Sequence, residues 1–190
     1  MLYTVAYPSV ASSDATFIEQ FRRAHDLPYR DVVAAHFTLV FGCKALPATE
    51  YVTHVQTIAD SATPVNFSCR YAMLGADHQD DTAYVFLVPD EGYSAISLLH
   101  DRLYTGALQP YLKRGVPFIP HITIGTMNDW NVAKALCDDL NRKGVRIDGS
   151  LQSVTVGALE NGRLRELSSY RLGTSRKSNL DPKQAETSSS

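Results

Sequence analysis

The pentapeptide His-Ile-Thr-Ile-Gly, residues 121–125, decides how the fold is interpreted. Its three central residues are β-branched, which favours a strand, and side chains along a strand alternate between its two faces. Ile122 and Ile124 therefore share an apolar face, whereas His121 and Thr123 share the opposite one. An imidazole and a hydroxyl together on the polar face of a core strand indicate a functional site.

A second copy of the pattern, His-Phe-Thr-Leu-Val, lies 85 residues earlier at 36–40. At the same offset the segment 71–75 falls on 156–160, and two helical patterns of similar length fall almost on one another. We therefore expect two copies of a strand-helix-strand unit, near 31–75 and 116–160. If the copies pack about a pseudo-twofold axis, the polar faces of the two motif strands line one cleft.

The order of elements along the chain favours an α+β fold over a doubly wound parallel sheet, because strands and helices alternate but hairpins also occur. Ser13 or Asp14 is expected to cap the first helix and Asn128 or Asp129 the last. The dipeptide Asn161-Gly162 predicts a tight hairpin turn. Strands are expected at residues 2–8, 32–42, 64–75, 82–90, 121–125, 151–160 and 163–173, the third and fourth pairing through a turn at 76–81. Helices are expected at 12–26, 48–62, 93–112, and from 129 or 130 to 143.

Length and composition set the class of protein. The chain has 190 residues, 44% of them hydrophobic, which suits one bilobal catalytic domain over 1–173, its lobes not contiguous in sequence, and a disordered polar tail at 174–190. Three cysteines at wide spacing, no apolar run of membrane-spanning length and no signal-peptide pattern favour the cytoplasm, with the nucleus as an alternative. A net charge of −2 argues against stable binding of long nucleic acid through phosphate contacts.

The four motif side chains suit acid-base chemistry on a phosphate. Two imidazoles can divide the work of general base and general acid, each step contributing about 10²- to 10⁴-fold. The hydroxyls of Thr38 and Thr123 can donate to nonbridging phosphate oxygens. No carboxylate accompanies His36 and His121 as metal ligands usually require, so we expect catalysis without a metal or cofactor.

The motifs HFTL (36–39) and HITI (121–124), the second preceded by Pro120, resemble those of the 2H phosphoesterase superfamily, which includes LigT-like 2′,5′ RNA ligases and cyclic nucleotide phosphodiesterases. The resemblance implies a duplicated bilobal fold, two antiparallel-rich sheets with outer helices around a central cleft. It also implies catalytic roles for His36 and His121, the latter as base by analogy, and phosphate binding by Thr38 and Thr123.

The substrates implied by the resemblance are small nucleotide-like molecules or RNA ends, and we expect a monomer that does not bind membranes. LigT-like proteins carry an arginine shortly after the second motif, but the residues here are GTMND, which favours hydrolysis of a small cyclic phosphate. Such a phosphate is a 2′,3′-cyclic nucleotide or ADP-ribose 1″,2″-cyclic phosphate. The alternatives are an RNA-end or 2′-5′ oligonucleotide phosphodiesterase or ligase, and a nucleotide-binding module without turnover.

Two aromatic residues are candidates for stacking on a nucleobase, a contact that contributes about 1–3 kcal/mol. Phe118 lies three residues before His121, and Tyr7 lies at the end of the first expected strand. Packing in the core is the preferred explanation for each of them. The basic pair Arg22-Arg23 is interpreted as a solvated helix face.

Overall fold

The computed structural model describes residues 1–76 and 82–173. Within these residues nine strands form one curled sheet in the order β2-β7-β4-β5-β6-β3-β1-β8-β9, and every neighbouring pair is antiparallel. The strands are β1 (Leu2–Ala6), β2 (Ser9–Val10), β3 (Phe37–Cys43), β4 (Val65–Ala76), β5 (Ala83–Glu91), β6 (Ile122–Met127), β7 (Ile147–Leu151), β8 (Ser153–Glu160) and β9 (Arg163–Arg171).

The sheet consists of two halves that meet between β3 and β6. Phe37 and Ile122 form the one ladder pair between these strands within the described residues. The neighbouring ladder between β5 and β6 runs from the pair Ala83–Met127 to the pair Leu87–Ile122. The two antiparallel halves expected from the sequence are therefore present, joined by a seam one residue pair wide.

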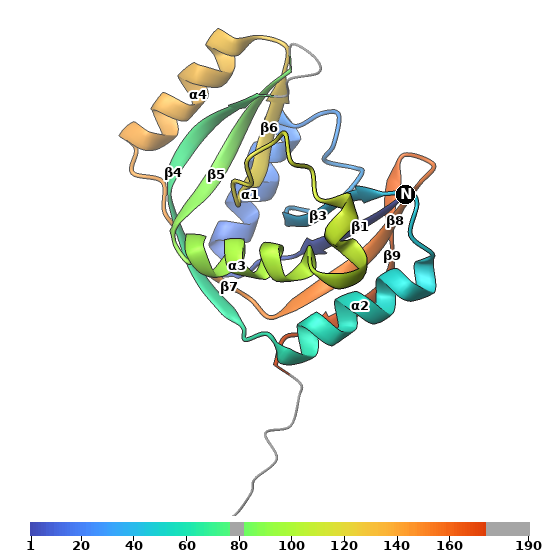
Figure 1. Cartoon of the computed structure of the whole chain (residues 1–190). Coiled ribbons are helices and arrows are strands. Elements are labelled where there is room, and N and C mark those ends of the chain that lie inside the picture. The colour runs from blue at the N-terminus through green and yellow to red at the C-terminus, as the bar shows by residue number, and fades with distance from the viewer. Residues whose placement is uncertain (77–81, 174–190) are drawn as a thin grey trace, which may run out of the picture.

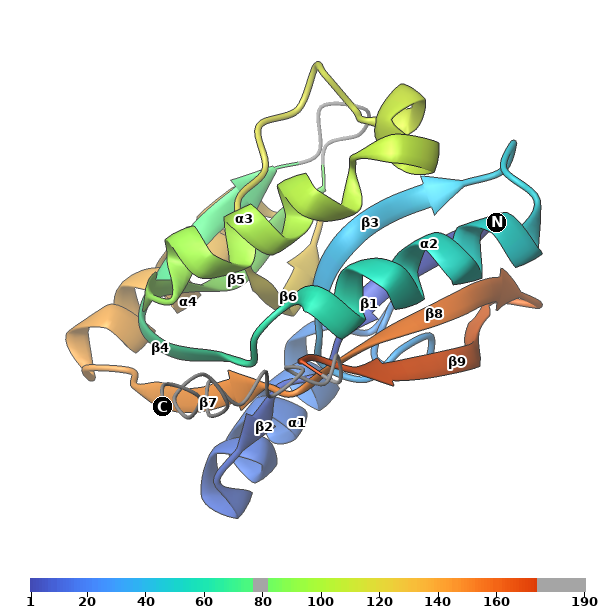
Figure 2. The same cartoon turned by 60° about the horizontal axis from the view of Figure 1, so that its bottom comes forward.

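Four α-helices and one 3₁₀ helix pack against this sheet in the described residues (Figure 1). Helix α2 contacts α3 and η1, and Figure 2 shows α2 and α3 along the same side of the sheet. Helix α1 packs on β6, and α4 packs on β4, β5 and β6. The helices are α1 (Ser12–His25), α2 (Ala48–Ser61), α3 (Tyr93–Leu103), η1 (Gly106–Tyr111) and α4 (Trp130–Arg142).

The chain crosses between the halves. Strand β4 follows α2, which packs on β8 and β9, yet β4 pairs with β5 and β7 in the other half. Strand β7 follows α4 and pairs with β4 in the same half, yet the next strand, β8, pairs with β1 and β9. Each half is therefore assembled from both parts of the chain.

Several local predictions from the sequence are confirmed by the structure. The side chain of Asp129 accepts hydrogen bonds from the backbone N–H groups of Asn131 and Val132, so it caps α4. Asn161 and Gly162 have φ angles of 50° and 73°, the left-handed values that a tight hairpin turn between β8 and β9 requires. Strands β4 and β5 pair as expected, but the turn at 77–81 and the tail at 174–190 lie outside the described residues.

Three local predictions are wrong, and two short strands were missed. The strand expected at 32–42 begins only at Phe37, because the segment before it bends toward α1, where the carbonyl groups of Tyr29 and Val33 accept hydrogen bonds from Arg22. The helix expected at 93–112 breaks after Leu103, where Gly106 has a φ of +50°, and continues as a 3₁₀ turn that contains Pro110. Ser13 and Asp14, the expected caps of the first helix, lie inside α1, which begins at Ser12 and has no side-chain cap. The short strands β2 and β7 were not expected, because the Asp148-Gly149 pair interrupts the apolar pattern of β7.

The core fills the space between the sheet and its helices. Phe37, Leu39, Ile122 and Ile124, the apolar residues of the two motif strands, are fully buried there. They pack with buried side chains of α2 and α3, so the face expected to be apolar is the core face. No helix in the described part of the chain has the length and apolar character needed to cross a bilayer.

Candidate active site

The two motif histidines occupy equivalent places, each at the residue immediately before its strand. Phe37 and Ile122 are paired across the seam in antiparallel register. Continuing that register by one residue sets His36 opposite Thr123 and Thr38 opposite His121. Since Phe37 and Ile122 point into the core, all four motif side chains point to the other face of the sheet.

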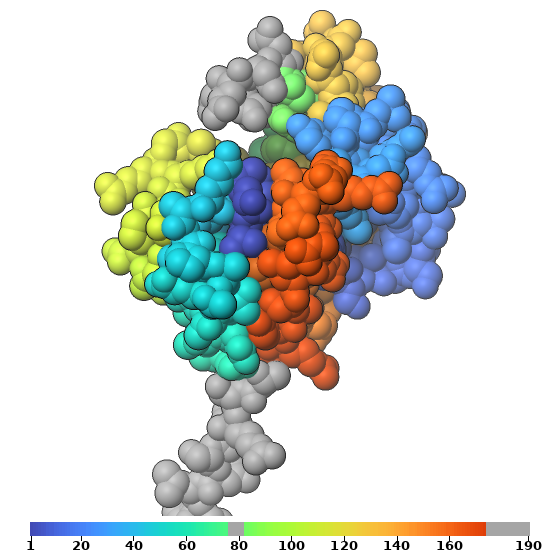
Figure 3. Space-filling view, turned by 90° about the vertical axis from the view of Figure 1, so that its right-hand side faces the viewer, coloured from blue at the N-terminus to red at the C-terminus, as the bar shows by residue number. Residues whose placement is uncertain are grey.

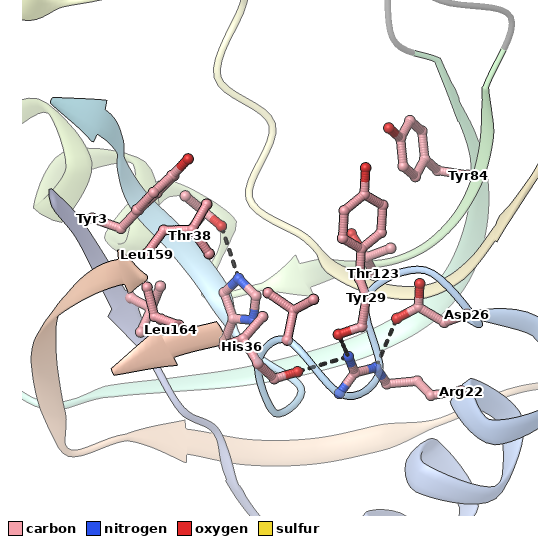
Figure 4. Close-up of a pocket in the computed structure, with 13 residues that line it drawn as sticks. Tyr3, Arg22, Asp26, Tyr29, His36, Thr38, Tyr84, Thr123, Leu159 and Leu164 are labelled. Carbon is pink, nitrogen blue, oxygen red and sulfur yellow. Dashed lines mark hydrogen bonds and ion pairs between the residues drawn. The ribbon is translucent and has the colours of Figure 1, made fainter. Parts of the chain in front are cut away.

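A cavity of about 270 Å³ opens on this face. Figure 3 shows a hollow where the N-terminal strand, the β8–β9 hairpin and the light-blue segment before β3 meet. Three of the four motif side chains, His36, Thr38 and Thr123, line the cavity, whereas His121 is not among its lining residues (Figure 4). The other described lining residues are Tyr3, Val5, Arg22, Asp26, Tyr29, Val32, Val33, Tyr84, Leu159 and Leu164.

Both motif histidines are held in the same tautomer. The Nδ1–H of His36 donates to the carbonyl of Ala34 at 2.8 Å, and the Nδ1–H of His121 donates to the carbonyl of Ile119 at 2.6 Å. A carbonyl oxygen can only accept, so in each neutral ring the proton is on Nδ1 and the lone pair is on Nε2. The Nε2 of His36 lies 3.0 Å from Oγ1 of Thr38, which must therefore be the donor.

Burial makes both imidazoles poor proton acceptors in the free protein. Burial lowers the pKa of His36 from 6.5 to about 4; the bond to Ala34 opposes this shift, and the charge of Arg22 and then that of His121 add to it. Burial also lowers the pKa of His121, partly offset by its bond to the carbonyl of Ile119. Both rings are thus neutral in the free protein at neutral pH.

An aromatic stack supports His121. Its ring lies on Phe86 with the centroids 3.7 Å apart and the planes 24° from parallel, and Phe86 stacks on Tyr84 at 5.5 Å. Gly75 on the neighbouring strand makes room for Phe86, because a Cβ there would lie 2.1 Å from the phenyl ring. Strand β5 therefore positions His121 through Phe86 and lines the cavity through Tyr84.

A buried ion pair forms part of the cavity wall. Nε of Arg22 donates to Asp26 at 3.0 Å, and the two side chains are 2% and 1% exposed. Burial raises the pKa of Asp26, opposed by the hydrogen bonds from Thr126 and Arg22. The interpretation of Arg22 as part of a solvated helix face is wrong, whereas Arg23 is exposed. One signal was available: residues 18, 22 and 26 follow helical spacing, which places Arg22 on the same face as the buried Ile18.

The two aromatic candidates for base stacking, Phe118 and Tyr7, make ring contacts with other side chains. Phe118 stacks on the buried ring of His100, with centroids 3.7 Å apart, and His100 in turn donates from Nδ1 to the carbonyl of Leu39. Tyr7 meets His36 edge-on at 6.5 Å, and burial followed by the nearby Glu166 raises the pKa of Tyr7 to about 12. Neither residue is among those that line the cavity.

The tyrosines that do line the cavity were not found from the sequence. Tyr3, Tyr29 and Tyr84 come from β1, the segment before β3, and β5 (Figure 4). No spacing rule connects positions so far apart, so only the folded chain brings them together. The three cysteines are buried and unpaired, and no group of three metal-ligating side chains occurs among residues 1–76 and 82–173.

Comparison with known proteins finds a matching family model and solved structures of similar fold. The model of the 2′-5′ RNA ligase superfamily matches residues 9–163. Among curated protein sequences, none matches the chain significantly. Among solved structures, Escherichia coli LigT is similar over 90% of this chain and 96% of its own, with 17% identity and a TM-score of 0.54.

Two further structures support the same fold. TT0787 of Thermus thermophilus has 14% identity and a TM-score of 0.56, over 90% of this chain and 97% of its own. Usb1 of Kluyveromyces marxianus has 9% identity and a TM-score of 0.52, over the same shares. LigT has also been solved in complex with NADP⁺, 3′-AMP, ATP and phosphate.

Proposed function

Because this chain belongs to the 2′-5′ RNA ligase superfamily of 2H phosphoesterases, we propose that it hydrolyses a cyclic phosphodiester by metal-independent, two-histidine catalysis. The proposed substrate is a 2′,3′-cyclic nucleotide or ADP-ribose 1″,2″-cyclic phosphate. The observation that carries the proposal is the matched pair of imidazoles, His36 and His121. Each ring is fixed by a backbone carbonyl two residues earlier, so that Nε2 is the reactive nitrogen.

The proposed reaction divides proton transfer between these rings. One Nε2 takes a proton from water as the water oxygen forms a bond to phosphorus, and the other gives a proton to the ribose oxygen as its bond to phosphorus breaks. By analogy His121 is the base and His36 the acid. Because the phosphodiester is an anion, its arrival raises the pKa of a neighbouring imidazole and so permits His36 to carry the proton that it gives up.

Thr38 and Thr123 are proposed to bind the phosphate. In the free protein the Thr38 hydroxyl donates to His36, and it can rotate to donate to a nonbridging oxygen once that ring is protonated. Thr123 lines the same cavity from the other motif strand. Neutral donors on both sides of the phosphate would stabilise the charge that grows on its oxygens during attack.

The walls of the cavity suit a nucleoside. Tyr3, Leu159 and Leu164 give an apolar side next to His36 and Thr38, and Tyr29 and Tyr84 add aromatic area. Stacking of a base on aromatic side chains contributes about 1–3 kcal/mol and tolerates any base. The binding of 3′-AMP by the similar LigT structure agrees with a nucleotide of this size.

The test is a parallel assay of the purified protein in EDTA. The substrates are the four 2′,3′-cyclic nucleotides, ADP-ribose 1″,2″-cyclic phosphate, a 2′-5′ dinucleotide and an RNA with a terminal cyclic phosphate. We expect turnover of a cyclic phosphate. Its rate should fall by about 10²-fold or more in both His36→Ala and His121→Ala. His25→Ala, which changes a histidine that packs on Phe21 of α1, is the matched control and should keep full activity.

The remaining outcomes decide between the alternatives. Preferred cleavage or joining of the 2′-5′ linkage would favour the RNA-end function, which the description of the family supports. Tight nucleotide binding without turnover would identify a binding module. Full activity in both single histidine variants, or a requirement for added metal, would overturn the mechanism.

A further inference from the structure

The seam between the motif strands β3 and β6 does not by itself fix the angle between them. Within the described residues, Phe37 and Ile122 form the one ladder pair that joins β3 to β6. A single pair fixes the strands at one point but leaves their relative angle without a backbone constraint. Two-histidine catalysis requires the rings of His36 and His121 to keep a constant relation to one phosphate, so another contact must supply that constraint.

One contact that spans the seam begins on α1. Arg22 is 2% exposed, and its Nε donates to Oδ2 of Asp26 at 3.0 Å. The other carboxylate oxygen of Asp26 accepts from Oγ1 of Thr126 at 2.8 Å. Thr126 belongs to β6, the strand that follows His121. One end of the guanidinium is therefore anchored to the second motif strand.

The other end reaches the segment that precedes the first motif strand. Nη2 of Arg22 donates to the carbonyl of Val33 at 2.8 Å and to that of Tyr29 at 3.3 Å. The next carbonyl along the chain, that of Ala34, accepts the proton from Nδ1 of His36. Figure 4 shows the guanidinium between Asp26 and this segment, beneath the cavity. Arg22 thus holds the backbone that fixes the tautomer of His36.

We infer that Arg22 is a positioning residue: its guanidinium, clamped by Asp26 and Thr126, holds the segment 29–34 against β6 and so fixes His36 relative to His121. The inference rests on the proposed function for its catalytic consequence, but not for its structural one. Arginine suits the position because its planar fork donates in several fixed directions, whereas a lysine ammonium is a compact point charge. A buried ion pair often contributes little net stability, so its presence here fits a role in fixing geometry.

The direct test is the tautomer of His36, measured by ¹⁵N–¹H correlation NMR of the imidazole at pH 8, where the ring is neutral. The wild-type protein should show Nδ1–H alone. Arg22→Met should give a mixture of tautomers, and Arg22→Lys, which keeps the charge without the fork, should not restore the single tautomer. Arg23→Gln, on the exposed side of the same helix turn, is the matched control and should match the wild type.

Thr126→Val is the second variant, since the loss of Arg22 leaves a buried carboxylate unpaired and can prevent folding. It removes the hydroxyl that holds Asp26 but keeps the shape of the side chain. Thr126→Val should therefore also give a mixture of His36 tautomers. On the active substrate, Arg22→Lys should lower kcat by about 10²-fold, as expected for a small misplacement, with little change in KM.

The outcomes separate the two proposals. A folded Arg22→Lys or Thr126→Val protein with the wild-type tautomer and wild-type kcat would overturn the inference. If the wild-type protein turns over no substrate, the proposed function fails. A tautomer change in the Arg22 variants would then still support the role of Arg22 in positioning His36.

Discussion

His36 should make the protein sensitive to acid. Its pKa falls from 6.5 in an unfolded chain to about 4 in the folded protein. Between these values the unfolded chain takes up a proton that the folded protein does not, so the free energy of unfolding falls as the pH is lowered from 6.5 to 4. At 1.36 kcal/mol per pKa unit, the loss is at most roughly 3 kcal/mol, and water that reaches the cavity reduces it.

The measurement is urea unfolding at pH 7, 6, 5 and 4 for the wild type and for His36→Asn, which has no titratable ring. The difference in unfolding free energy between the two proteins should shift in favour of the variant by roughly 2–3 kcal/mol between pH 7 and pH 4. His100 and His121, whose pKa values are also lowered, are present in both proteins and cancel. Thr38→Val, which keeps the imidazole but removes the hydroxyl that donates to its neutral Nε2, should show a smaller loss than the wild type. Parallel curves for wild type and His36→Asn would show that the ring is not held neutral by burial.

Three further predictions concern single contacts. Asp129→Ala removes the cap of α4 and should lower the unfolding free energy by about 1 kcal/mol in urea titration, whereas Asp129→Asn should cost less than half of that. Gly92→Ala should cost more than about 1 kcal/mol, seen as a lower Tm, because the residue has a φ of +83° and a Cβ there would lie 2.4 Å from the carbonyl oxygen of Asn66; an unchanged Tm would contradict this. Gly75→Ala should displace Phe86 from His121, costing about 1–3 kcal/mol of stability and lowering kcat; wild-type turnover would show that the stack does not position the ring.

Features of the candidate site that depend on residues close in sequence could be predicted. Alternation along a strand was sufficient to place His36 and Thr38 on one face, because the period of a strand is fixed by backbone geometry. The meeting of the two motifs followed from their repetition, and the register through Phe37 and Ile122 places the four side chains on one surface. Asp129 and the Asn161-Gly162 turn were predictable for the same reason, since caps and turns depend on a few adjacent residues.

What could not be predicted depends on contacts between distant segments. The helical spacing of Arg22 with Ile18 could indicate its burial, but no local pattern predicts that the segment 29–33 bends back to offer it two carbonyl groups. Tyr3, Tyr84 and Leu164 share a cavity only because the sheet curls, and curvature is not encoded in the spacing of any one strand. The seam is likewise a property of the whole sheet, because its width depends on how β3 and β6 diverge from Phe37 and Ile122.

The crossing of the chain between the halves has a consequence for biosynthesis. Strand β1 is synthesised about 150 residues before β8, the strand with which it pairs. Tyr3 at one end of the chain and Leu159 and Leu164 near the other form one wall of the cavity. At about 5–20 residues added per second, β1 must therefore wait roughly 8–30 s for its partner. A nascent chain released before β8 is complete would carry both motifs and yet lack the chamber in which they could act together.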